Sequence, residues 1–280
     1  GEFDIFYTKQ DKKTGKWIEP QNIGHPINTE GNEEGIIVAT DGNYAYFSSE
    51  RSDIGSGGKD IFYFSIPEKA KPDKVVLMKG KVKTEDVQSL KNTKLEVRFK
   101  SGDVYEQNID ISDDGSYVAI ANIGSGEEDV VLEIKEEGKA FESKLIKKEE
   151  SNKTFIEDQE LEITDIKKGS THTIQDILFE TNSSTIDPAS KLVLEAFAAW
   201  MNENKEIKIE IQGHTDDVGG EDDNLALSKD RAFSVMEFLI ELKVVASRLS
   251  FKGYGESQPK YENSSDSNRS KNRRTDFLIL

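Results

Sequence analysis

The sequence of 280 residues contains no cysteine, and its three histidines, His25, His172 and His214, stand in separate segments. Without cysteine there is no disulfide and no thiolate metal site, an absence that suits an oxidising compartment as well as the cytosol. Three scattered histidines also give no ligand spacing for zinc. We therefore expect no metal and no cofactor.

Long apolar runs are missing as well. No stretch approaches the ~20 apolar residues that a membrane-spanning helix requires, and no charged-then-apolar signal segment opens the chain. The sequence begins with Gly1 instead of methionine and enters a predicted strand at once. We interpret it as a fragment, in which case any signal peptide or lipid anchor lies outside these residues.

Positive charge is scarce, with 37 Lys and Arg against 54 Asp and Glu, which gives a formal net charge of -17. Phosphate neutralisation needs Lys and Arg clustered over a broad face, so we expect no nucleic-acid partner. The length suits a multidomain protein with two or three domains of roughly 100 residues each.

The first region, residues 1–72, carries an internal repeat. Asp4-Ile5-Phe6-Tyr7 recurs as Asp60-Ile61-Phe62-Tyr63, and such self-similarity is typical of repeat folds. Alternating aromatic and aliphatic residues predict short antiparallel strands over residues 36–39, 44–48 and 60–65. The glycine-rich segment 55–58 is interpreted as a hairpin turn, because no helix-forming Gly-Lys-Ser/Thr follows it to hold a phosphate.

The segment Tyr46-Phe47-Ser48-Ser49-Glu50-Arg51, its glycine-rich loop and the following Gly58-Lys59-Asp60-Ile61-Phe62-Tyr63 resemble the blade repeat of the WD40-like (PD40) β-propellers. The resemblance implies a β-propeller fragment of about one blade. A blade without neighbours cannot close a ring, so it must pack on another domain or be weakly stable.

A charged, proline-containing linker at residues 67–73 predicts a domain boundary before the second region, residues 73–168. Period-two alternation there predicts strands over residues 75–82, 94–99, 103–111, 116–120, 130–136 and 141–146. Turn signals at residues 101–102, 113–115 and 137–138 favour a small all-β sandwich. The motifs Gly80-Lys81-Val82, Leu95-Glu96-Val97, Asp114-Gly115-Ser116-Tyr117 and Val131-Leu132-Glu133-Ile134 resemble the carboxypeptidase regulatory-like domain.

The acidic segment 110–115 has the oxygen-rich spacing that opens an EF-hand calcium loop. Its twelfth position, where a bidentate Glu belongs, is Ala121, and its flanks are predicted strands. A tight hairpin turn is therefore expected instead of a calcium site. The mixed-charge stretch 147–168 predicts an edge strand followed by a linker.

The third region, residues 169–280, alternates strands with helices. Strands are predicted over residues 173–179, 207–212, 249–255 and 275–280, and helices from Pro188, over about 221–242 and around 268–274. Asp187 and Pro188 open the first helix as its N-cap and first position. Its expected buried stripe consists of Val193, Leu194, Phe197 and Met201. The pattern predicts an α/β (βαβαβ) layer with helices packed on one sheet.

One face of the second helix of this region is polar near the N-terminus of the helix and apolar near its C-terminus. Helical spacing puts six residues on that face: Asn224, Ser228, Arg231, Val235, Leu239 and Leu242. The preceding strand delivers Asp216 to the same end of the sheet. Two readings remain open from spacing alone: Asp216 and Arg231 form a structural salt bridge, or they bind a ligand that carries both charges.

Fixed-spacing motifs over about residues 171–280 resemble the peptidoglycan-binding domain of the OmpA C-terminal family. They are Phe179-Glu180-Thr181-Asn182, Gly213-His214-Thr215-Asp216, Val218-Gly219, Asn224, Leu227-Ser228, Arg231-Ala232, Gly253-Tyr254-Gly255, Pro259 and Asn272-Arg273-Arg274. The resemblance implies a non-covalent pocket for the diaminopimelate of the peptidoglycan stem peptide. Asp216 would accept from its ammonium, Arg231 would donate a fork to its carboxylate, and Asn182 and Asn224 would add uncharged contacts.

Three features lie outside that core site. Asn272-Arg273-Arg274 matches the family, but its contribution to ligand or to the last strand is left open. Residues 268–271 lack a glycine that many relatives carry, and Glu221, Asp222 and Asp223 make one rim acidic. His214 is interpreted as a hydrogen-bonding strand-end residue, because no Ser or Cys nucleophile accompanies it for catalysis.

The expected function is that of a non-enzymatic envelope protein, located in the periplasm at the outer membrane of a Gram-negative bacterium, that anchors an assembly to peptidoglycan. The domain order resembles periplasmic lipoproteins of type IX secretion, which implies protein partners. A protein–protein scaffold with incidental wall binding is the alternative. A peptidoglycan hydrolase is disfavoured, because the sequence lacks a paired acidic dyad, a nucleophile and a metal site.

Overall fold

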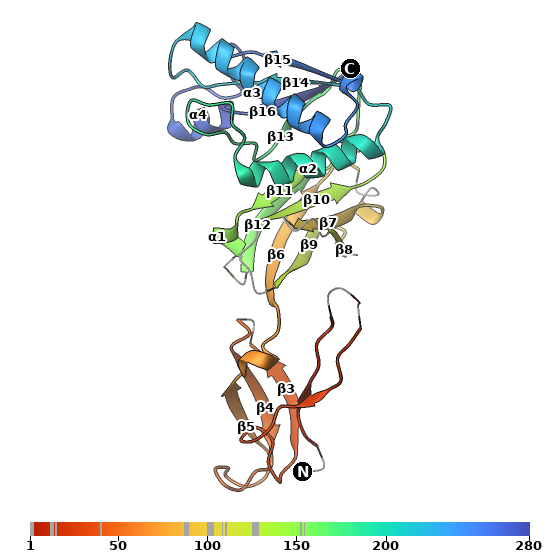
Figure 1. Cartoon of the computed structure of the whole chain (residues 1–280), viewed down its shortest axis with the longest axis vertical. Helices are drawn as coiled ribbons and strands as arrows, with labels where there is room; N and C mark the ends of the chain where they lie inside the picture. The colour runs from red at the N-terminus through yellow and green to blue at the C-terminus, as the bar shows by residue number, and fades with distance from the viewer. Residues whose placement is uncertain are drawn as a thin grey trace. The chain divides into compact units, whose positions relative to one another are not determined.

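The computed structural model describes residues 3–11, 14, 16–39, 41–86, 90–99, 104–107, 109, 111–124, 129–151, 153 and 155–280 (Figure 1). Its packing divides the chain into two compact units. One contains Gly1–Val75 with Asn122–Gly126, and the other contains Val76–Ala121 with Glu127–Leu280. Within the described residues, no helix is both long and apolar enough to cross a membrane.

The first unit is built on a three-stranded antiparallel sheet of order β3-β4-β5, as the alternation predicts. Its elements are β1 (Phe6–Tyr7), β2 (Gln21–Asn22), β3 (Glu33–Val38), β4 (Tyr44–Ser49), β5 (Asp60–Ser65) and the 3-10 helix η1 (Glu68–Ala70). One face buries Phe47 against Ile5, Ile23 and Ile27. The two copies of the repeated tetrapeptide therefore differ, because Ile5 is buried in this core whereas Ile61 is 82% exposed.

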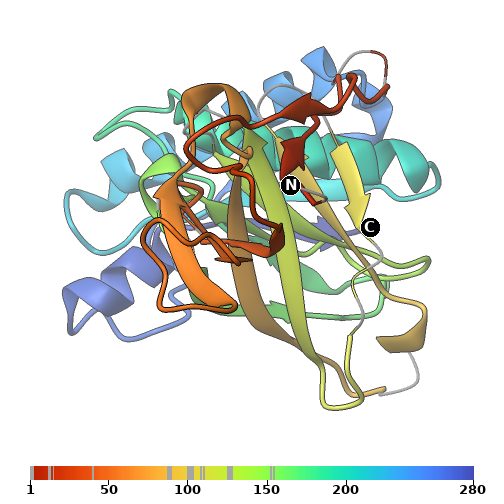
Figure 2. The ribbon, with the colours of Figure 1, turned by 90° about the horizontal axis from the view of Figure 1, so that it is seen from below.

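The first part of the second unit is a pair of β-sheets, which matches the expected small all-β arrangement. Its elements are β6 (Lys74–Lys83), β7 (Lys94–Phe99), β8 (Val104–Gln107), β9 (Ser116–Gly124), β10 (Val130–Lys135), β11 (Ser143–Ile146), α1 (Lys148–Ser151) and β12 (Phe155–Glu162). The strand orders are β11-β10-β7-β8 and β12-β6-β9. β12 is an edge strand, as residues 147–168 predict, and β6 and β9 can be followed by colour in Figure 2.

The segment before β9 forms a tight turn but not the expected hairpin, because β8 and β9 belong to different sheets. Ser116 donates from its backbone N–H and its hydroxyl to the two oxygens of Asp114, at 3.0 and 2.8 Å. Gly115 has a φ of +84°, and an added Cβ would lie 2.2 Å from the Val82 carbonyl oxygen. The strand expected over 103–111 is shorter, at Val104–Gln107. The turn at 101–102 and Asp110 lie outside the described residues.

The second part of this unit is an α/β layer. Its elements are β13 (Thr171–Ile174), α2 (Pro188–Glu203), β14 (Ile209–Gly213), α3 (Glu221–Glu241), η3 (Ala246–Arg248), β15 (Leu249–Gly253), α4 (Asp266–Asn272) and β16 (Thr275–Ile279). The sheet order is β13-β16-β14-β15, in which β14 pairs in parallel with β15 and antiparallel with β16. Figure 1 shows α3 lying along this sheet.

The start of α2 follows its sequence pattern. Asp187 is the N-cap, its carboxylate accepts from the Ala189 N–H at 2.9 Å, and Pro188 occupies the first helical position. The strand predicted over 173–179 is wrong in its second half, because β13 ends at Ile174. Asp176 then adopts a φ of +61°, which turns the chain away from the sheet before the bridge of Phe179 with Ile186.

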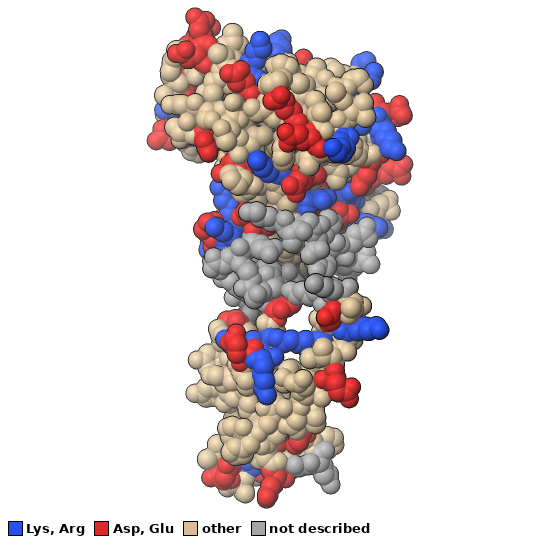
Figure 3. All heavy atoms as spheres, viewed as in Figure 1, with Lys and Arg blue, Asp and Glu red and all other residues tan. Residues whose placement is uncertain are grey.

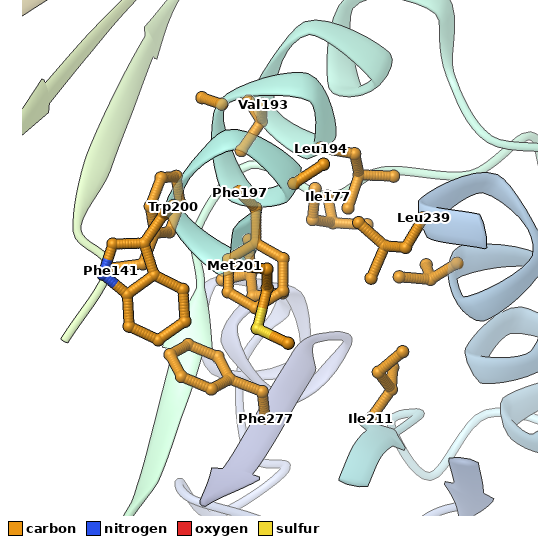
Figure 4. Packing of buried hydrophobic residues seen from close by; sticks show 14 of the residues in the cluster. Phe141, Ile177, Val193, Leu194, Phe197, Trp200, Met201, Ile211, Leu239 and Phe277 are labelled. Atoms are coloured by element: carbon orange, nitrogen blue, oxygen red, sulfur yellow. The ribbon is translucent and has the colours of Figure 1, made fainter. Parts of the chain in front are cut away.

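The core of the α/β layer continues into the sandwich (Figure 4). The predicted stripe of α2 is fully buried, with Val193, Leu194, Phe197 and Met201 at 0% exposure. Phe141, from the segment between β10 and β11, packs edge-on against Phe197 with ring centroids 5.1 Å apart. The indole N–H of Trp200 donates to the Lys139 carbonyl at 3.1 Å. Helix α2 therefore belongs to both packing layers.

Two glycines allow α3 to approach the sheet closely. Gly213 of β14 lies directly opposite Gly253 of β15 in the parallel register. A Cβ added at Gly213 would lie 2.1 Å from the Ser228 carbonyl oxygen, and one at Gly253 would lie 2.4 Å from the Lys229 nitrogen. Because these contacts are with helix backbone, the absence of a side chain at both positions fixes the depth of α3.

We predict that Gly253→Ala lowers the free energy of unfolding by about 1–3 kcal/mol, the usual range for overpacking. The added methyl group forces α3 outward, since the backbone of Lys229 cannot rotate away. Urea unfolding of the whole chain measures the change.

Gly220→Ala is the matched control. Its Cβ would meet only the Asp223 carboxylate, at 3.2 Å, so its cost should stay below about 1 kcal/mol. Equal destabilisation by the two variants would contradict the proposed packing role.

Candidate functional site

The four residues singled out from the sequence line one cavity of about 400 Å³, which we call the anchor pocket. Asp216 follows β14, Arg231 and Asn224 belong to α3, and Asn182 lies in the turn after Phe179. The close approach of α3 to β14 brings the first three together. The cavity is lined by Phe179, Glu180, Thr181, Asn182, Thr215, Asp216, Val218, Asn224, Leu227, Arg231 and Arg273.

Asp216 is 6% exposed, and its carboxylate is held from two sides. Oδ1 accepts from the Val218 N–H at 3.1 Å, and Oδ2 accepts from Arg273 Nη1 at 2.5 Å. A carboxylate has about four acceptor positions, so these two contacts leave capacity for another donor. Asp216 is thus a pre-oriented, partly neutralised acceptor.

Arg231 makes no ion pair within the described part of the chain, so the structural salt bridge with Asp216 that spacing left open is not formed. Its Nε donates to the Ser183 carbonyl at 3.0 Å, and its guanidinium carbon lies 5.0 Å from the Phe179 ring centre. Burial, together with the charge of Arg273, lowers the pKa of Arg231, while Asp216 opposes this shift. The guanidinium remains protonated at neutral pH, and its position is fixed without a carboxylate partner.

The two asparagines of the anchor pocket differ in their exposure and in their hydrogen bonds. Asn224 is 5% exposed, and its amide nitrogen donates to the Asp216 carbonyl at 3.3 Å and to Glu256 Oε2 at 2.5 Å. Asn182 is exposed and has a φ of +53°. Asn182 lies well beyond the first strand, because β13 ends eight residues earlier at Ile174 instead of reaching the predicted end at residue 179. Asn224 braces the Asp216 loop, whereas Asn182 stands at the pocket edge.

The motif Asn272-Arg273-Arg274, whose contribution the sequence analysis left open, contains three residues with different roles. Asn272 is fully buried and holds the chain at Lys260 and Tyr261, with its Oδ1 accepting from both N–H groups at 2.9 and 3.0 Å. Arg273 reaches Asp216. Arg274 pairs with the buried Asp276 at 2.8 Å. Arg273 is therefore a pocket residue that sequence reasoning left out, although the motif itself had been noticed.

The segment that lacks the expected glycine forms helix α4, and it supports the pocket. Arg269 Nε donates to Asp217 Oδ1 at 2.7 Å, beside Asp216 in the chain. This pair lowers the pKa of Asp217 and raises that of Arg269. Asp217 is exposed and Arg269 is half-buried, so the pair restrains the loop more than it stabilises the fold.

His214 is 3% exposed and stacks on Tyr254, with ring centroids 5.3 Å apart. Neither ring nitrogen has a hydrogen-bond partner among the described atoms, and Nε2 lies 3.6 Å from Asp276 Oδ2. The prediction of a hydrogen-bonded histidine is therefore wrong. Burial, with the charge of Arg274, lowers the pKa of His214 to about 4, so the ring is neutral near pH 7. No group of three or more His, Asp or Glu side chains suited to a metal occurs among the residues described.

We predict that stability falls as the pH is lowered from about 6.5 towards 4. The unfolded chain binds a proton on His214 in this range while the folded chain does not, so the free energy of unfolding decreases by at most about 1.4 kcal/mol per pH unit. The pKa of His172 is also lowered by burial and adds in the same sense. Denaturant unfolding between pH 7 and pH 5 measures the slope.

His214→Phe keeps an aromatic ring against Tyr254 and should reduce that slope, leaving the share of His172. An NMR titration that gives His214 a pKa above 6 in the folded chain would contradict this account.

Residues 178–273 match the model of the OmpA family. Curated relatives include the peptidoglycan-associated lipoprotein of Mesorhizobium japonicum, 37% identical over 83 residues that cover 30% of this chain and 49% of that protein. Outer membrane porin F of Pseudomonas fluorescens is 34% identical over 104 residues, which cover 37% of this chain and 32% of that protein. The chain thus spans about half or less of the length of these relatives.

Among solved structures, the peptidoglycan-associated lipoprotein from Burkholderia pseudomallei matches at 26% identity and a TM-score of 0.35, over 37% of this chain and 88% of that one. The matched segment of the family model holds Asp216, Arg231 and Arg273. The part of this chain that is similar to the OmpA family is thus residues 178–273, which include α2, β14, α3, β15 and α4.

Proposed function

We propose that this protein binds peptidoglycan non-covalently through residues 169–280 and anchors an outer-membrane or periplasmic assembly to the cell wall. The ligand is the zwitterionic end of diaminopimelate in the stem peptide. The observation that carries the proposal is that Asp216 and Arg231 line one cavity, while Arg231 has no carboxylate within ion-pair distance in the described part of the chain.

The charges of the anchor pocket suit such a ligand. A ligand ammonium would donate to the remaining acceptor positions of Asp216, and a ligand carboxylate would accept from the terminal N–H groups of Arg231. Arg273 adds a second cation next to Asp216, with its side chain 48% exposed. The pocket therefore favours a group that carries one ammonium and at least one carboxylate.

The role is binding rather than catalysis. His214 is neutral and buried, and neither of its ring nitrogens is hydrogen-bonded to a nucleophile among the described residues. Peptidoglycan association and outer-membrane location are in the names of the relatives, and they support a periplasmic position at the outer membrane for this protein. On the face drawn in Figure 3, Lys and Arg are interspersed with Asp and Glu, which offers no broad basic surface for nucleic acid.

We predict that the whole chain binds meso-diaminopimelate saturably in isothermal titration calorimetry. Asp216→Ala and Arg231→Ala should each weaken binding by about 30-fold or more, because each removal leaves a ligand charge unpaired in a partly buried site. The whole chain is used because Phe141 and Lys139 of the sandwich contact α2.

Glu221→Ala is the control, since Glu221 is exposed in the first turn of α3 and does not line the pocket. It should bind like the wild type. No saturable binding, or equal affinity of all variants with native circular dichroism, would refute the proposed ligand.

A second candidate function is a protein–protein scaffold of a secretion machinery of the type IX class, with wall binding incidental. One observation favours it: the face of β3-β4-β5 opposite the buried Phe47 carries exposed apolar side chains. They are Ile37 at 69%, Tyr46 at 47%, Ile61 at 82% and Tyr63 at 69%. On this proposal residues 1–72 are a propeller-like segment and residues 73–168 a carboxypeptidase regulatory-like sandwich, and the first presents a contact surface.

We predict that Ile61→Asp reduces capture of envelope proteins by the immobilised chain, because it places a charge at the most exposed position of that face. Binding of meso-diaminopimelate should be unchanged. Capture of the same proteins by wild type and variant would argue against a scaffold that uses this face.

A further inference from the structure

The anchor pocket is one part of a longer groove. A small cavity of about 80 Å³ adjoins it, and beyond that lies a third cavity of about 460 Å³, which we call the basic pocket. The anchor pocket and the small cavity share Phe179, Arg231 and Arg273. The small cavity and the basic pocket share Ile177, Leu178, Arg273 and Arg274. Because neighbouring cavities share lining residues, the three adjoin one another along residues 173–182, and we call them together the groove.

The basic pocket has an excess of positive charge. Its lining contains Lys260, Lys271, Arg273 and Arg274 against one carboxylate, Asp176. The buried Asp276 neutralises part of this charge, because Arg274 and Lys260 lie 2.8 and 3.4 Å from its oxygens. Asp176 in turn accepts from the Leu145 N–H at 3.0 Å. A concave cationic site in a chain of net charge -17 is selective for an anionic group.

Lys271 is a cation of the basic pocket that does not take part in the ion pairs around Asp276. It is exposed, and it makes no ion pair with any residue that the structure describes. Its Nζ lies 5.0 Å from the centre of the Tyr261 ring. The ammonium is therefore positioned over an aromatic face at the edge of the cavity, with its three N–H donors available.

His214 forms part of the wall between the two larger cavities. It lines the small cavity between the other two, it is 3% exposed, and neither ring nitrogen has a hydrogen-bond partner among the described atoms. Both ring nitrogens are fully buried, so His214 contributes shape to the cavity wall and no hydrogen bond to an occupant.

We propose that the basic pocket accepts a second carboxylate of the same ligand whose zwitterionic end lies between Asp216 and Arg231. The inference rests on the proposed peptidoglycan function and specifies its ligand further, as an acidic peptide instead of a single amino acid. Arg273 lines all three cavities and joins the two binding positions. The peptide lies along residues 173–182, with its second carboxylate next to Lys271 and Arg274.

Three probes test this with the whole chain in calorimetry: meso-diaminopimelate, the dipeptide γ-D-glutamyl-meso-diaminopimelate, and the same dipeptide with its glutamyl α-carboxylate converted to a carboxamide. Lys271→Glu should weaken binding of the acidic dipeptide by about tenfold through like-charge repulsion. It should change binding of the other two probes by no more than about twofold. The loss should also shrink at 0.5 M salt, where exposed charges are screened.

Lys252→Glu is the matched control, because Lys252 also lies over a tyrosine ring, at 4.5 Å from Tyr254, but lines none of the three cavities. It should bind all probes like the wild type. An equal effect of Lys271→Glu on the acidic and the amidated dipeptide, or no effect on either, would overturn the second carboxylate position. Failure of the wild type to bind meso-diaminopimelate would instead overturn the proposed function itself.

Discussion

The candidate site depends on how closely α3 lies on the sheet. Gly213 and Gly253 stand opposite each other where the backbone of Ser228 and Lys229 passes over the strands, and neither position has room for a methyl group. The Ser228 hydroxyl accepts from the Gly255 N–H at 2.8 Å, which ties the helix to the loop after β15. Since Arg231 sits one turn beyond Ser228 and Asp216 follows β14, this packing sets the position of both charges.

The second constraint is the excess of positive charge around Asp216. This excess distinguishes a candidate binding site from a structural ion pair. A self-contained salt bridge would join Asp216 to Arg231 and leave no demand for a ligand. Instead Asp216 is paired with Arg273, and Arg231 is held by a carbonyl and an aromatic ring. Arg231 is therefore a partly buried cation without a carboxylate partner among the described residues, and an unpaired buried charge is costly. On the proposed function, a ligand carboxylate would relieve that cost.

The sandwich supports the α/β layer through α2. Trp200 donates to Lys139, Phe197 packs on Phe141, and Lys135 lies 2.7 Å from Glu203 at the end of the helix. Burial of two large aromatic rings across this contact contributes more than the ion pair, in which Glu203 is exposed and Lys135 half-buried. The helix that supports the sheet beneath the groove is therefore also a core element of the sandwich, which couples the two layers.

Local patterns in the sequence determined the elements of the α/β layer. Asp187 and Pro188 give the start of α2, 3.6-residue spacing gives the buried stripe of α2 and the polar-to-apolar face of α3, and alternation gives β14 and β16. Asp216 and Arg231 could be paired in advance because one follows a strand and the other lies on the next helix, 15 residues away. These features depend on neighbours within a few turns, so the sequence carries them directly.

Only the tertiary structure decided which partners meet over long separations. Arg273 reaches Asp216 across 57 residues, Lys260 and Arg274 meet around Asp276, and His214 is buried without a partner. The periodicity of apolar residues in the sequence does not predict such contacts, because they depend on where separate elements end after packing. The early end of β13 has the same origin: the sequence predicts a strand over residues 173–179, yet residues 175–178 leave the sheet and line the cavities beside it. The sequence by itself determined the elements and the central pair of charges, and tertiary packing decided which counter-charges surround them in the candidate site.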